Sequence, residues 1–271
     1  MKREEQQPLH GRTVLLTRAR AQSSRMAARL ESLGASVIHC PTIEIVPPTS
    51  WTRLDASIGK LEEYDWIAFT SANAVEFFFR RLRDRRKDGI EAIRRLACCA
   101  IGPATAEALE SAGVVAQVIA SESRSEGALK AIVDHLGSED AIRGVAFLIP
   151  RARSARDVLP AGLRSLGARV DDVETYQTVK PNLQGQSIIR LLQETSIDVI
   201  TFTSPSTVSN FSELVGANDL SDLLANTRVA CIGPVTAEAA ARHGLANIIQ
   251  PETYSASALV DSIVQSIGVG S

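Results

Sequence analysis

Short apolar runs alternate with longer amphipathic stretches along most of this chain. In the first half the apolar runs are TVLLT (13–17), SVIHC (36–40), WIAFT (66–70), CCAIG (98–102) and VVAQVI (114–119). The stretches between them have helical periodicity and begin near Gln22, Asn73, Ala104 and Glu126. β-rich runs followed by amphipathic segments of ~10–15 residues are typical of βα units around a parallel sheet. The pattern therefore predicts an α/β protein.

The same pattern occurs twice. Residues 11–37 align with residues 144–170, and within them Arg18 and Arg151 are 133 residues apart (151 − 18 = 133). The tripeptide FTS at 69–71 recurs at 202–204 with this offset. GPATA at 102 and GPVTA at 233 are 131 residues apart (233 − 102 = 131). A unit of this length is much longer than a solenoid repeat, so we infer duplication of a domain.

Glycine and proline mark the expected helix ends. A glycine follows a helical stretch at four positions and suits a left-handed C-cap: Gly34, Gly113, Gly167 and Gly244. A proline stands where a helix is expected to begin at Pro103, Pro205 and Pro234, where its missing N–H has no cost. These residues support the predicted helix boundaries.

Two extended stretches interrupt the βα pattern at matching places. CPTIEIVPP (40–48) and ETYQTVKP (174–181) are bounded by prolines and read as linkers or a two-stranded hinge. If the chain passes between domains at both, the domain formed from the middle of the chain is inserted into the other.

Composition excludes several function classes. The 271 residues have a formal net charge of −2 and 12 aromatic residues, which argues against a nucleic-acid or membrane-binding surface. The N-terminus shows no export signal, and no apolar run approaches the ~20 residues of a membrane span. Three of the four cysteines lie in apolar, strand-like runs, and no CxxC pair occurs, so we expect buried thiols rather than a metal site: Cys40, Cys98, Cys99 and Cys231. We expect a cytoplasmic protein.

A basic run, RRLRDRRKD, occupies residues 80–88. We interpret it as a solvated helix end and loop in preference to a partner-binding patch.

Candidate binding residues follow the predicted strands, because ligands of open parallel sheets bind beyond the carboxyl ends of the strands. The first repeat places there Arg18, Thr70, Ser71, Ala72, Asn73, Gly102 and Thr105. The second places there Arg151, Thr203, Ser204, Ser206, Gly233 and Thr236. Glycine and small hydroxyl residues at a helix start leave backbone N–H groups available to a carboxylate or phosphate. Ser71 and Ser204 could instead simply cap helices. Two matching sets favour a pair of anion-binding surfaces.

The common catalytic motifs are missing: we find no GxSxG, GxxxxGK[ST], HExxH or strand-linked GxGxxG sequence. The four histidines lie on the predicted tail, a strand end and helix ends, which does not favour catalysis: His10, His39, His135 and His243. Tyr176, in the second linker, has the most suggestive position. A linker tyrosine more often serves packing, but its hydroxyl could donate a proton to a bound group.

The order and spacing of these segments resemble one known family. GRTVLLTRAR, WIAFTSANAV, ACCAIGPATA, ETYQTV, VITFTSPSTV and RVACIGPVTA, in this order from Gly11 to about Val264, resemble the uroporphyrinogen-III synthase family. The resemblance implies two similar α/β domains, each a parallel sheet flanked by helices, joined by a two-stranded linker with the active site in the interdomain cleft. It places residues 1–40 and 182–271 in one domain, 49–173 in the inserted domain, and 41–48 and 174–181 in the linker.

The resemblance also implies an activity. The family is a cyclising hydro-lyase of tetrapyrrole biosynthesis that needs no cofactor or metal. It closes hydroxymethylbilane, an octacarboxylate, to uroporphyrinogen III with inversion of the terminal ring and loss of water. Tyr176 would assist departure of the hydroxyl, and Ser71, Thr105 and Thr236 match positions associated with substrate binding or activity. Arg228 occupies a basic position of the family and could pair with a carboxylate. We further expect a monomer that binds neither nucleic acid nor membrane, with transient hand-over of the bilane from the enzyme that forms it.

A different class of protein shares the duplicated lobes and the hinge. A non-catalytic two-domain binding or sensor protein could close on a polycarboxylate or tetrapyrrole without turning it over. Turnover of the bilane separates the two hypotheses.

Overall fold

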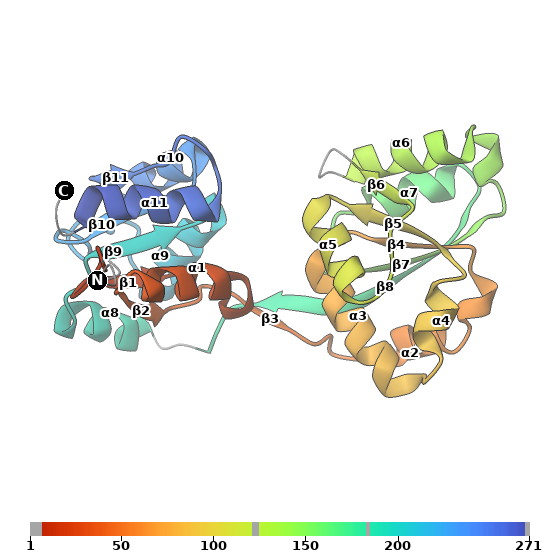
Figure 1. Ribbon diagram of the computed structural model, residues 1–271, viewed down its shortest axis with the longest axis horizontal. Coiled ribbons are helices and arrows are strands. Elements are labelled where there is room, and N and C mark those ends of the chain that lie inside the picture. The colour runs from red at the N-terminus through yellow and green to blue at the C-terminus, as the bar shows by residue number, and fades with distance from the viewer. Residues whose placement is uncertain (1–6, 121–124, 183–184, 269–271) are drawn as a thin grey trace, which may run out of the picture. The chain divides into compact units, whose positions relative to one another are not determined.

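The computed structural model describes residues 7–120, 125–182 and 185–268. The chain divides into two compact units: residues 1–44 with 179–271 form unit 1, and residues 45–178 form unit 2. Each unit is a sheet flanked by helices (Figure 1). No helix in the described parts of the chain is long and apolar enough to cross a membrane.

Unit 1 contains a five-stranded sheet, sheet 1, in the order β11-β10-β9-β1-β2. Its strands are β1 (Thr13–Leu16), β2 (Ser36–His39), β9 (Val199–Phe202), β10 (Arg228–Cys231) and β11 (Ile248–Ile249), all paired in parallel. Its helices are α1 (Arg20–Ser32), α8 (Gly185–Glu194), α9 (Pro205–Val215), α10 (Pro234–Arg242) and α11 (Ala256–Ile267).

Unit 2 contains a six-stranded sheet, sheet 2, in the order β3-β8-β7-β4-β5-β6. Its strands are β3 (Glu44–Val46), β4 (Trp66–Phe69), β5 (Ala97–Ile101), β6 (Val118–Ala120), β7 (Ala146–Ala152) and β8 (Arg169–Val179). Its helices are α2 (Thr52–Ile58), α3 (Ala72–Arg85), α4 (Gly89–Ile93), α5 (Pro103–Ser111), α6 (Ser125–Leu136) and α7 (Val158–Ser165), with 3₁₀ turns η1 (Leu61–Glu63) and η2 (Asp140–Ile142).

Each sheet combines strands from both sequence repeats. Sheet 1 takes β1 and β2 from the first repeat and β9, β10 and β11 from the second, whereas sheet 2 takes β4, β5 and β6 from the first and β7 and β8 from the second. When sheet 1 is read from β11 and sheet 2 from β6, strands that correspond in the two repeats follow one another in the same order. The duplicated halves of the chain are therefore not the structural units, because each unit borrows strands from the other half.

Alternating strand residues bury the two faces of sheet 1, as a parallel sheet requires. Val14 and Leu16 point to one face, where Leu30 of α1 and Ile263 of α11 cover them. Leu15 points to the other face, where the sheet packs against α8, α9 and α10. Burial on both faces explains why the strands appear in the sequence as continuous apolar runs.

Sheet 2 is buried in the same way. Ile67 and Phe69 of β4 face α2, α3, α4 and α5, where Phe78 and Phe79 of α3 fill the core. Trp66 and Ala68 face α6 and α7. All four cysteines of the chain are buried, as predicted, and burial raises the pKa of Cys98, Cys99 and Cys231 to about 12.

The predicted helix ends are confirmed. Pro103, Pro205 and Pro234 each occupy the first position of a helix. Gly34, Gly113, Gly167 and Gly244 follow helices with φ between 78° and 93°. A side chain is strained in this region of the backbone, which accounts for glycine at these ends.

The chain crosses between the units at residues 44–45 and 178–179, inside the two segments expected as linkers. Residues 174–178 nevertheless belong to sheet 2, because β8 continues along β7 and pairs Glu174 with Arg151 and Tyr176 with Ala152. Tyr176 is therefore a strand residue of unit 2.

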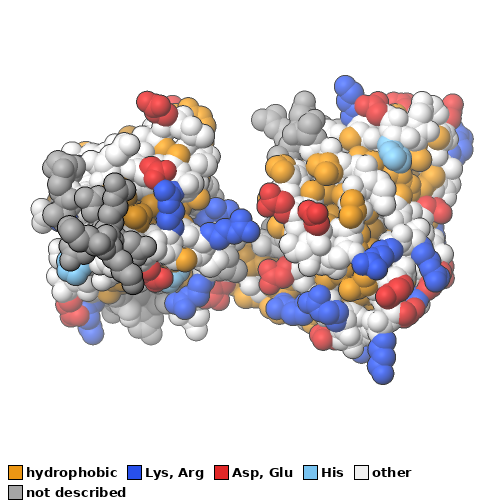
Figure 2. Space-filling view, in the orientation of Figure 1, with side chains coloured by type: hydrophobic (Ala, Val, Ile, Leu, Met, Phe, Trp, Pro, Cys, Tyr) orange, Lys and Arg blue, Asp and Glu red, His pale blue; other side chains and the backbone are white. Residues whose placement is uncertain are grey.

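The basic run 80–88 contributes to packing within unit 2. Arg81 forms a bidentate pair with Asp55 of α2 at 2.6–2.7 Å, and Arg86 pairs with Glu62 and Asp88. The guanidinium of Arg80 lies 4.3 Å from the centre of the Phe77 ring. Basic and acidic side chains lie side by side over the visible face of this unit (Figure 2). Several charges of the run are thus neutralised within the unit.

Candidate functional site

The loops that follow the strands of a parallel sheet share one edge, which we call the carboxyl edge. At the carboxyl edge of sheet 1, the loops after β10, β9 and β1 are neighbours, and they begin at Ile232, Thr203 and Thr17. The Thr17 hydroxyl donates to the Thr201 carbonyl oxygen at 2.6 Å and connects the ends of β1 and β9. From β1 the chain adds β2 on one side of the sheet and later adds β9, β10 and β11 on the other side, so the strand order reverses between β1 and β9. Such a switch point is where open α/β sheets bind ligands.

Helices begin directly at this edge. Ser204 is the N-cap of α9 and forms a capping box with Thr207, and its Oγ lies 2.9 Å from the Ser206 Oγ. Gly233 is the N-cap of α10. Such helix starts offer backbone N–H groups and the positive end of the helix dipole to an anion. The Ser204 hydroxyl itself is engaged in capping, so backbone groups and Ser206 are the main donors here.

At the carboxyl edge of sheet 2, the structure brings two predicted residues together. The Ser71 Oγ and the Tyr176 Oη lie 3.1 Å apart (either can donate), and the Ser71 Oγ also accepts from the Ala74 N–H at 3.2 Å. Ser71 is the N-cap of α3, and Ala72 and Asn73 form its first turn, half-buried. The Tyr176 ring stacks on Phe77 of α3 with centres 5.8 Å apart. A buried ring thus holds a phenol hydroxyl at the start of a helix.

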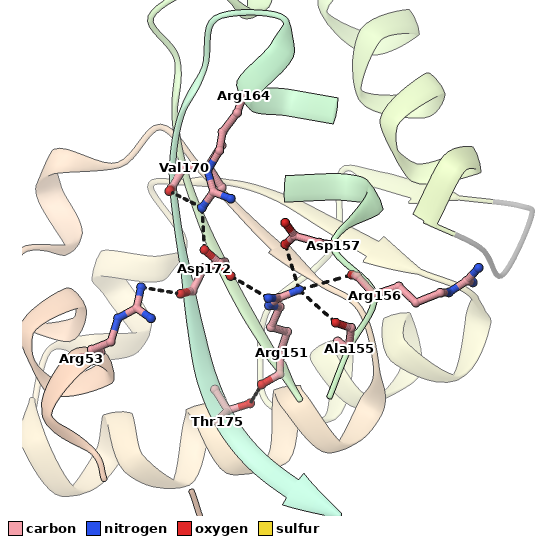
Figure 3. A network of polar contacts seen from close by, with 9 residues as sticks. All are labelled: Arg53, Arg151, Ala155, Arg156, Asp157, Arg164, Val170, Asp172 and Thr175. Carbon is pink, nitrogen blue, oxygen red and sulfur yellow. Dashed lines mark hydrogen bonds and ion pairs between the residues drawn. The ribbon is translucent and has the colours of Figure 1, made fainter. Parts of the chain in front are cut away.

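Arg151 is held within its own unit (Figure 3). Its guanidinium lies 2.9 Å from Asp172 and 3.3 Å from Asp157, and it donates to the carbonyl oxygens of Ala155 and Arg156 at 3.3 Å. Burial of Asp172 opposes ionisation, but the hydrogen bond from Arg164 and the charges of Arg151 and Arg164 outweigh it and lower the pKa of this carboxyl group. Arg151 therefore stabilises the fold rather than presenting a free cation.

The duplicated arginine, Arg18, has different surroundings. It is half-buried, its Nε donates to the Gln22 Oε1 at 2.9 Å, and burial lowers its pKa. Among the described residues no carboxylate forms an ion pair with it. A half-buried guanidinium without a carboxylate partner is suited to a ligand carboxylate.

Strand register explains this difference between the two arginines. In sheet 2, Ile149 of β7 is paired with Asp172, and in sheet 1 the equivalent Leu16 of β1 is paired with His39. His39 thus stands where the other unit has the acid that neutralises arginine. Its Nδ1 lies 3.4 Å from the Ser23 Oγ. Burial and the charge of Arg20 lower the pKa of His39, against the opposing charge of Glu31.

Other predicted residues lie close to these edges but are less available. Gly102 and Gly233 begin α5 and α10, as expected. Thr105 and Thr236 stand one turn into these helices and are only 3% exposed, so their side chains face the protein. Thr203, directly after β9, is half-buried.

Arg228 is not brought together with the other residues. It is the first residue of β10, and it pairs with Val199 at the amino end of β9. Its Nη1 donates to the Ser266 Oγ of α11 at 2.6 Å, beside a surface hollow of about 680 Å³. Because β10 separates it from Gly233, its guanidinium lies at the opposite edge of sheet 1.

Sequence reasoning missed several residues of these edges. Asp172 and Asp157, which neutralise Arg151, follow no motif. The exposed side chain of Tyr254 lies close to Gly233, and its loop has no periodic pattern. Among the described residues no group of three or more His, Cys, Asp or Glu side chains is placed to hold a metal ion.

Comparison with known proteins agrees with these observations. Residues 24–261 match the family described as uroporphyrinogen-III synthase HemD. The chain is 36% identical over 235 residues to the uroporphyrinogen-III synthase of Synechococcus elongatus, covering 85% of this chain and 86% of that protein. It is 29% identical over 257 residues to the uroporphyrinogen-III synthase of Chlorobaculum parvum, covering 94% and 99%.

Two solved structures have the same fold. The uroporphyrinogen-III synthetase of Helicobacter pylori matches with a TM-score of 0.58 at 15% identity, over 94% of this chain and 99% of that one. A mutant uroporphyrinogen III synthase of Thermus thermophilus matches with a TM-score of 0.56 at 18% identity, over 94% and 98%. The two-domain α/β architecture predicted from the sequence is confirmed.

Proposed function

Because the chain belongs to the uroporphyrinogen-III synthase family, a family of enzymes of tetrapyrrole biosynthesis, we propose that it cyclises hydroxymethylbilane. The product is uroporphyrinogen III, formed with inversion of the terminal ring and loss of one water molecule. Among this chain's own residues, the main support for the proposal is the pair of hydroxyl groups of Ser71 and Tyr176, which lie 3.1 Å apart at the carboxyl edge of sheet 2.

The substrate carries eight carboxylates, and the carboxyl edges offer donors that suit them. Helix starts at Ser71, Ser204 and Gly233 supply backbone N–H groups. Arg18 supplies a guanidinium without a carboxylate partner among the described residues. Distributed contacts of this kind bind a large anion without fixing each carboxylate rigidly.

Tyr176 provides the proton for the first step of this proposal. The hydroxyl of the hydroxymethyl group leaves as water with the tyrosine proton, and the C–O bond electrons leave with the oxygen. The pyrrole nitrogen lone pair stabilises the azafulvene cation that remains. The Ser71 hydroxyl donates to the phenolate oxygen while it is charged. The proton lost from the pyrrole carbon after ring closure restores the tyrosine.

Positioning contributes at least as much as the proton donor. Unconstrained closure proceeds without ring inversion, so the enzyme must hold the chain in the pose that inverts. Favourable orientation is worth ~7–11 kcal/mol in well-studied systems, whereas a positioned general acid contributes ~10²–10⁴-fold. We therefore assign Tyr176 an assisting role within a binding site.

The finer parts of the proposal come from the sequence. We propose that residues 41–48 and 174–181, which contain the two crossings between the units and the last part of β8, act as linker strands. We also propose that the protein works as a cytoplasmic monomer and receives the bilane from the enzyme that forms it. Family membership supports a small-molecule substrate. A coupled assay in which the bilane-forming enzyme is replaced by free bilane at the same flux tests the hand-over.

One experiment tests the activity. The protein is incubated with freshly made hydroxymethylbilane, the products are oxidised, and the porphyrin isomers are separated. Type III isomer in excess over a protein-free control is the expected result. Type I isomer alone, formed at the spontaneous rate, would mean that the protein binds the bilane without converting it, as the sensor hypothesis holds.

A further inference from the structure

Two large apolar side chains are exposed at the carboxyl edge of sheet 1. Val235, the second residue of α10, and Tyr254, in the loop between β11 and α11, are each 63% exposed. The helix that carries Val235 and the loop that carries Tyr254 follow the neighbouring strands β10 and β11. Single exposed apolar side chains are common on protein surfaces, but these two lie near one residue, Gly233, at the edge where open parallel sheets bind ligands.

Gly233 determines how the Tyr254 ring lies. The φ of Gly233 is −176°, an extended conformation open to any residue, so backbone conformation does not require glycine here. A Cβ at this position would stand 3.2 Å from the Tyr254 Cδ1 and 3.3 Å from its Cγ, tighter than nine in ten real Cβ contacts. The missing side chain lets the ring lie against the backbone. One side of the tyrosine ring therefore lies close to Gly233, while most of its surface stays in solvent.

The other repeat lacks these side chains. Val235 corresponds to Ala104 at the offset of 131 residues, and Tyr254 corresponds to Arg124 at the offset of 130 that relates Ile248 of β11 to Val118 of β6 (248 − 118 = 130; 254 − 130 = 124). Arg124 lies outside the described residues. In the sequence, a tyrosine stands at this place in the second repeat alone, and in unit 1 Arg18 pairs with no carboxylate among the described residues.

The position of Tyr254 relative to Arg18 limits the ligand. Tyr254 follows β11 and Arg18 follows β1, and these strands are three strand spacings apart in sheet 1, which is ~14 Å. A ligand that contacts both needs a flat π face at one point and a carboxylate at another, about this far apart. Pyrrole rings that carry carboxylate side chains provide both.

We propose that Tyr254, supported by Val235, is a substrate-binding surface on which one pyrrole ring of the bilane stacks. This inference rests on the proposed function. The stacked ring and the carboxylate on Arg18 together fix the direction of the linear tetrapyrrole along the edge. Tyr254 thereby helps to select the pose that leads to ring inversion.

Replacement of Tyr254 tests the proposal. Tyr254→Ala is expected to raise KM for hydroxymethylbilane five- to tenfold, about 1–1.4 kcal/mol, and to lower the fraction of type III product, with Tm unchanged because the side chain is exposed. Tyr254→Phe keeps the ring and should stay within twofold of wild type. Val115→Ala, at a 73% exposed position of unit 2, is the matched control. A Tyr254→Ala enzyme with KM within twofold and an unchanged isomer fraction would overturn the proposal.

A double-mutant cycle tests the role of Gly233. Gly233→Ala places a Cβ against the ring and should raise KM in the wild-type background but not further in the Tyr254→Ala background. Fully additive effects would show that Gly233 does not act through Tyr254 and would overturn this step.

The stacking surface can be tested separately from catalysis. If wild-type protein forms no type III isomer, the proposed function fails. Titration with uroporphyrin I, followed by its fluorescence, then probes ring binding directly. Weaker binding to Tyr254→Ala than to wild type and Tyr254→Phe would sustain the stacking surface, and equal affinities would overturn it.

Discussion

The hydroxyl groups of Ser71 and Tyr176 lie 3.1 Å apart, although 105 residues separate them in the chain. Ser71 ends the loop after β4, and Tyr176 lies on β8, two strands away in sheet 2. Stacking on Phe77 lets the tyrosine reach the start of α3. Tyr176 thus has a hydrogen-bonding partner for its hydroxyl at the start of α3, an arrangement that a capping serine alone does not provide.

Removal of the tyrosine hydroxyl should lower turnover without unfolding the protein. We expect Tyr176→Phe to reduce kcat about tenfold, less than the ~10²–10⁴-fold of a general acid, because positioning carries much of the rate. The ring still stacks on Phe77, so Tm should stay within a degree or two. Steady-state kinetics and thermal unfolding measure the two effects. A wild-type kcat would refute the proton-donor role.

Tyr64→Phe is the matched control. The Tyr64 Oη donates to Asp171 at 2.5 Å and lies 3.2 Å from the Ser57 Oγ, away from the Ser71 hydroxyl. Loss of a hydrogen bond to a charged group costs about 1.5–3 kcal/mol of stability. This variant should therefore lower Tm and leave kcat unchanged, the reverse of Tyr176→Phe.

The two duplicated arginines should respond differently to the same substitution. Arg151→Gln leaves Asp172 with one guanidinium fewer, so we expect the free energy of unfolding to fall by about 2 kcal/mol and Tm by about 4–8 °C. Arg18→Gln removes a group that pairs with no carboxylate among the described residues. It should raise KM about five- to tenfold with Tm unchanged, as loss of one charge-assisted contact predicts. Equal effects of the two variants on KM would contradict the assignment.

The sequence predicted the strands, helix ends and edge residues, because these depend on local features. Burial on both faces makes strands apolar, and proline and glycine mark helix ends such as those at Pro234 and Gly244. The Ser71–Tyr176 contact depends on strand order, which no local pattern contains. In the sequence, Arg18 and Arg151 both stand in an RAR tripeptide and look equivalent. Only strand register shows that Asp172 faces one of them and His39 the other.

Helix phase and loop packing were equally hidden. Thr105 and Thr236 stand beside exposed helix starts, yet the third position of each helix turns inward and buries them to 3% exposure. Tyr254 belongs to a loop without periodicity, and its contact with Gly233 depends on neighbouring strands. Arg228 looked like a ligand for a carboxylate, but it begins β10 and so lies at the other edge.

Asp172 should make the stability of the protein depend on acidic pH. Its pKa in the folded state is lowered below the ordinary value of about 3.9. A lowered carboxyl pKa contributes stability that is fully present above the unfolded pKa and is lost as pH falls through the folded pKa. Urea unfolding measured from pH 6 down to pH 2 should therefore show that the free energy of unfolding begins to fall near pH 4. This fall should be smaller in Asp172→Asn than in the wild type. Asp134→Asn, on α6 and outside the Arg151 network, is the control. Parallel curves for wild type and Asp172→Asn would exclude this contribution.

Buried thiols should protect all four cysteines from modification. Burial raises the pKa of Cys40 to about 11 and that of Cys98, Cys99 and Cys231 to about 12, because a thiolate in an apolar core loses its hydration. At pH 8 the thiolate fraction of a group with a pKa of 12 is about 10⁻⁴, and the reagent must also reach it. Ellman's reagent should therefore label the native protein only as fast as the core around the thiols opens. In denaturant it should label all four thiols at once. Fast labelling of one thiol at pH 8 in native conditions would identify a cysteine whose surroundings open far more readily than the core around Cys98 and Cys99.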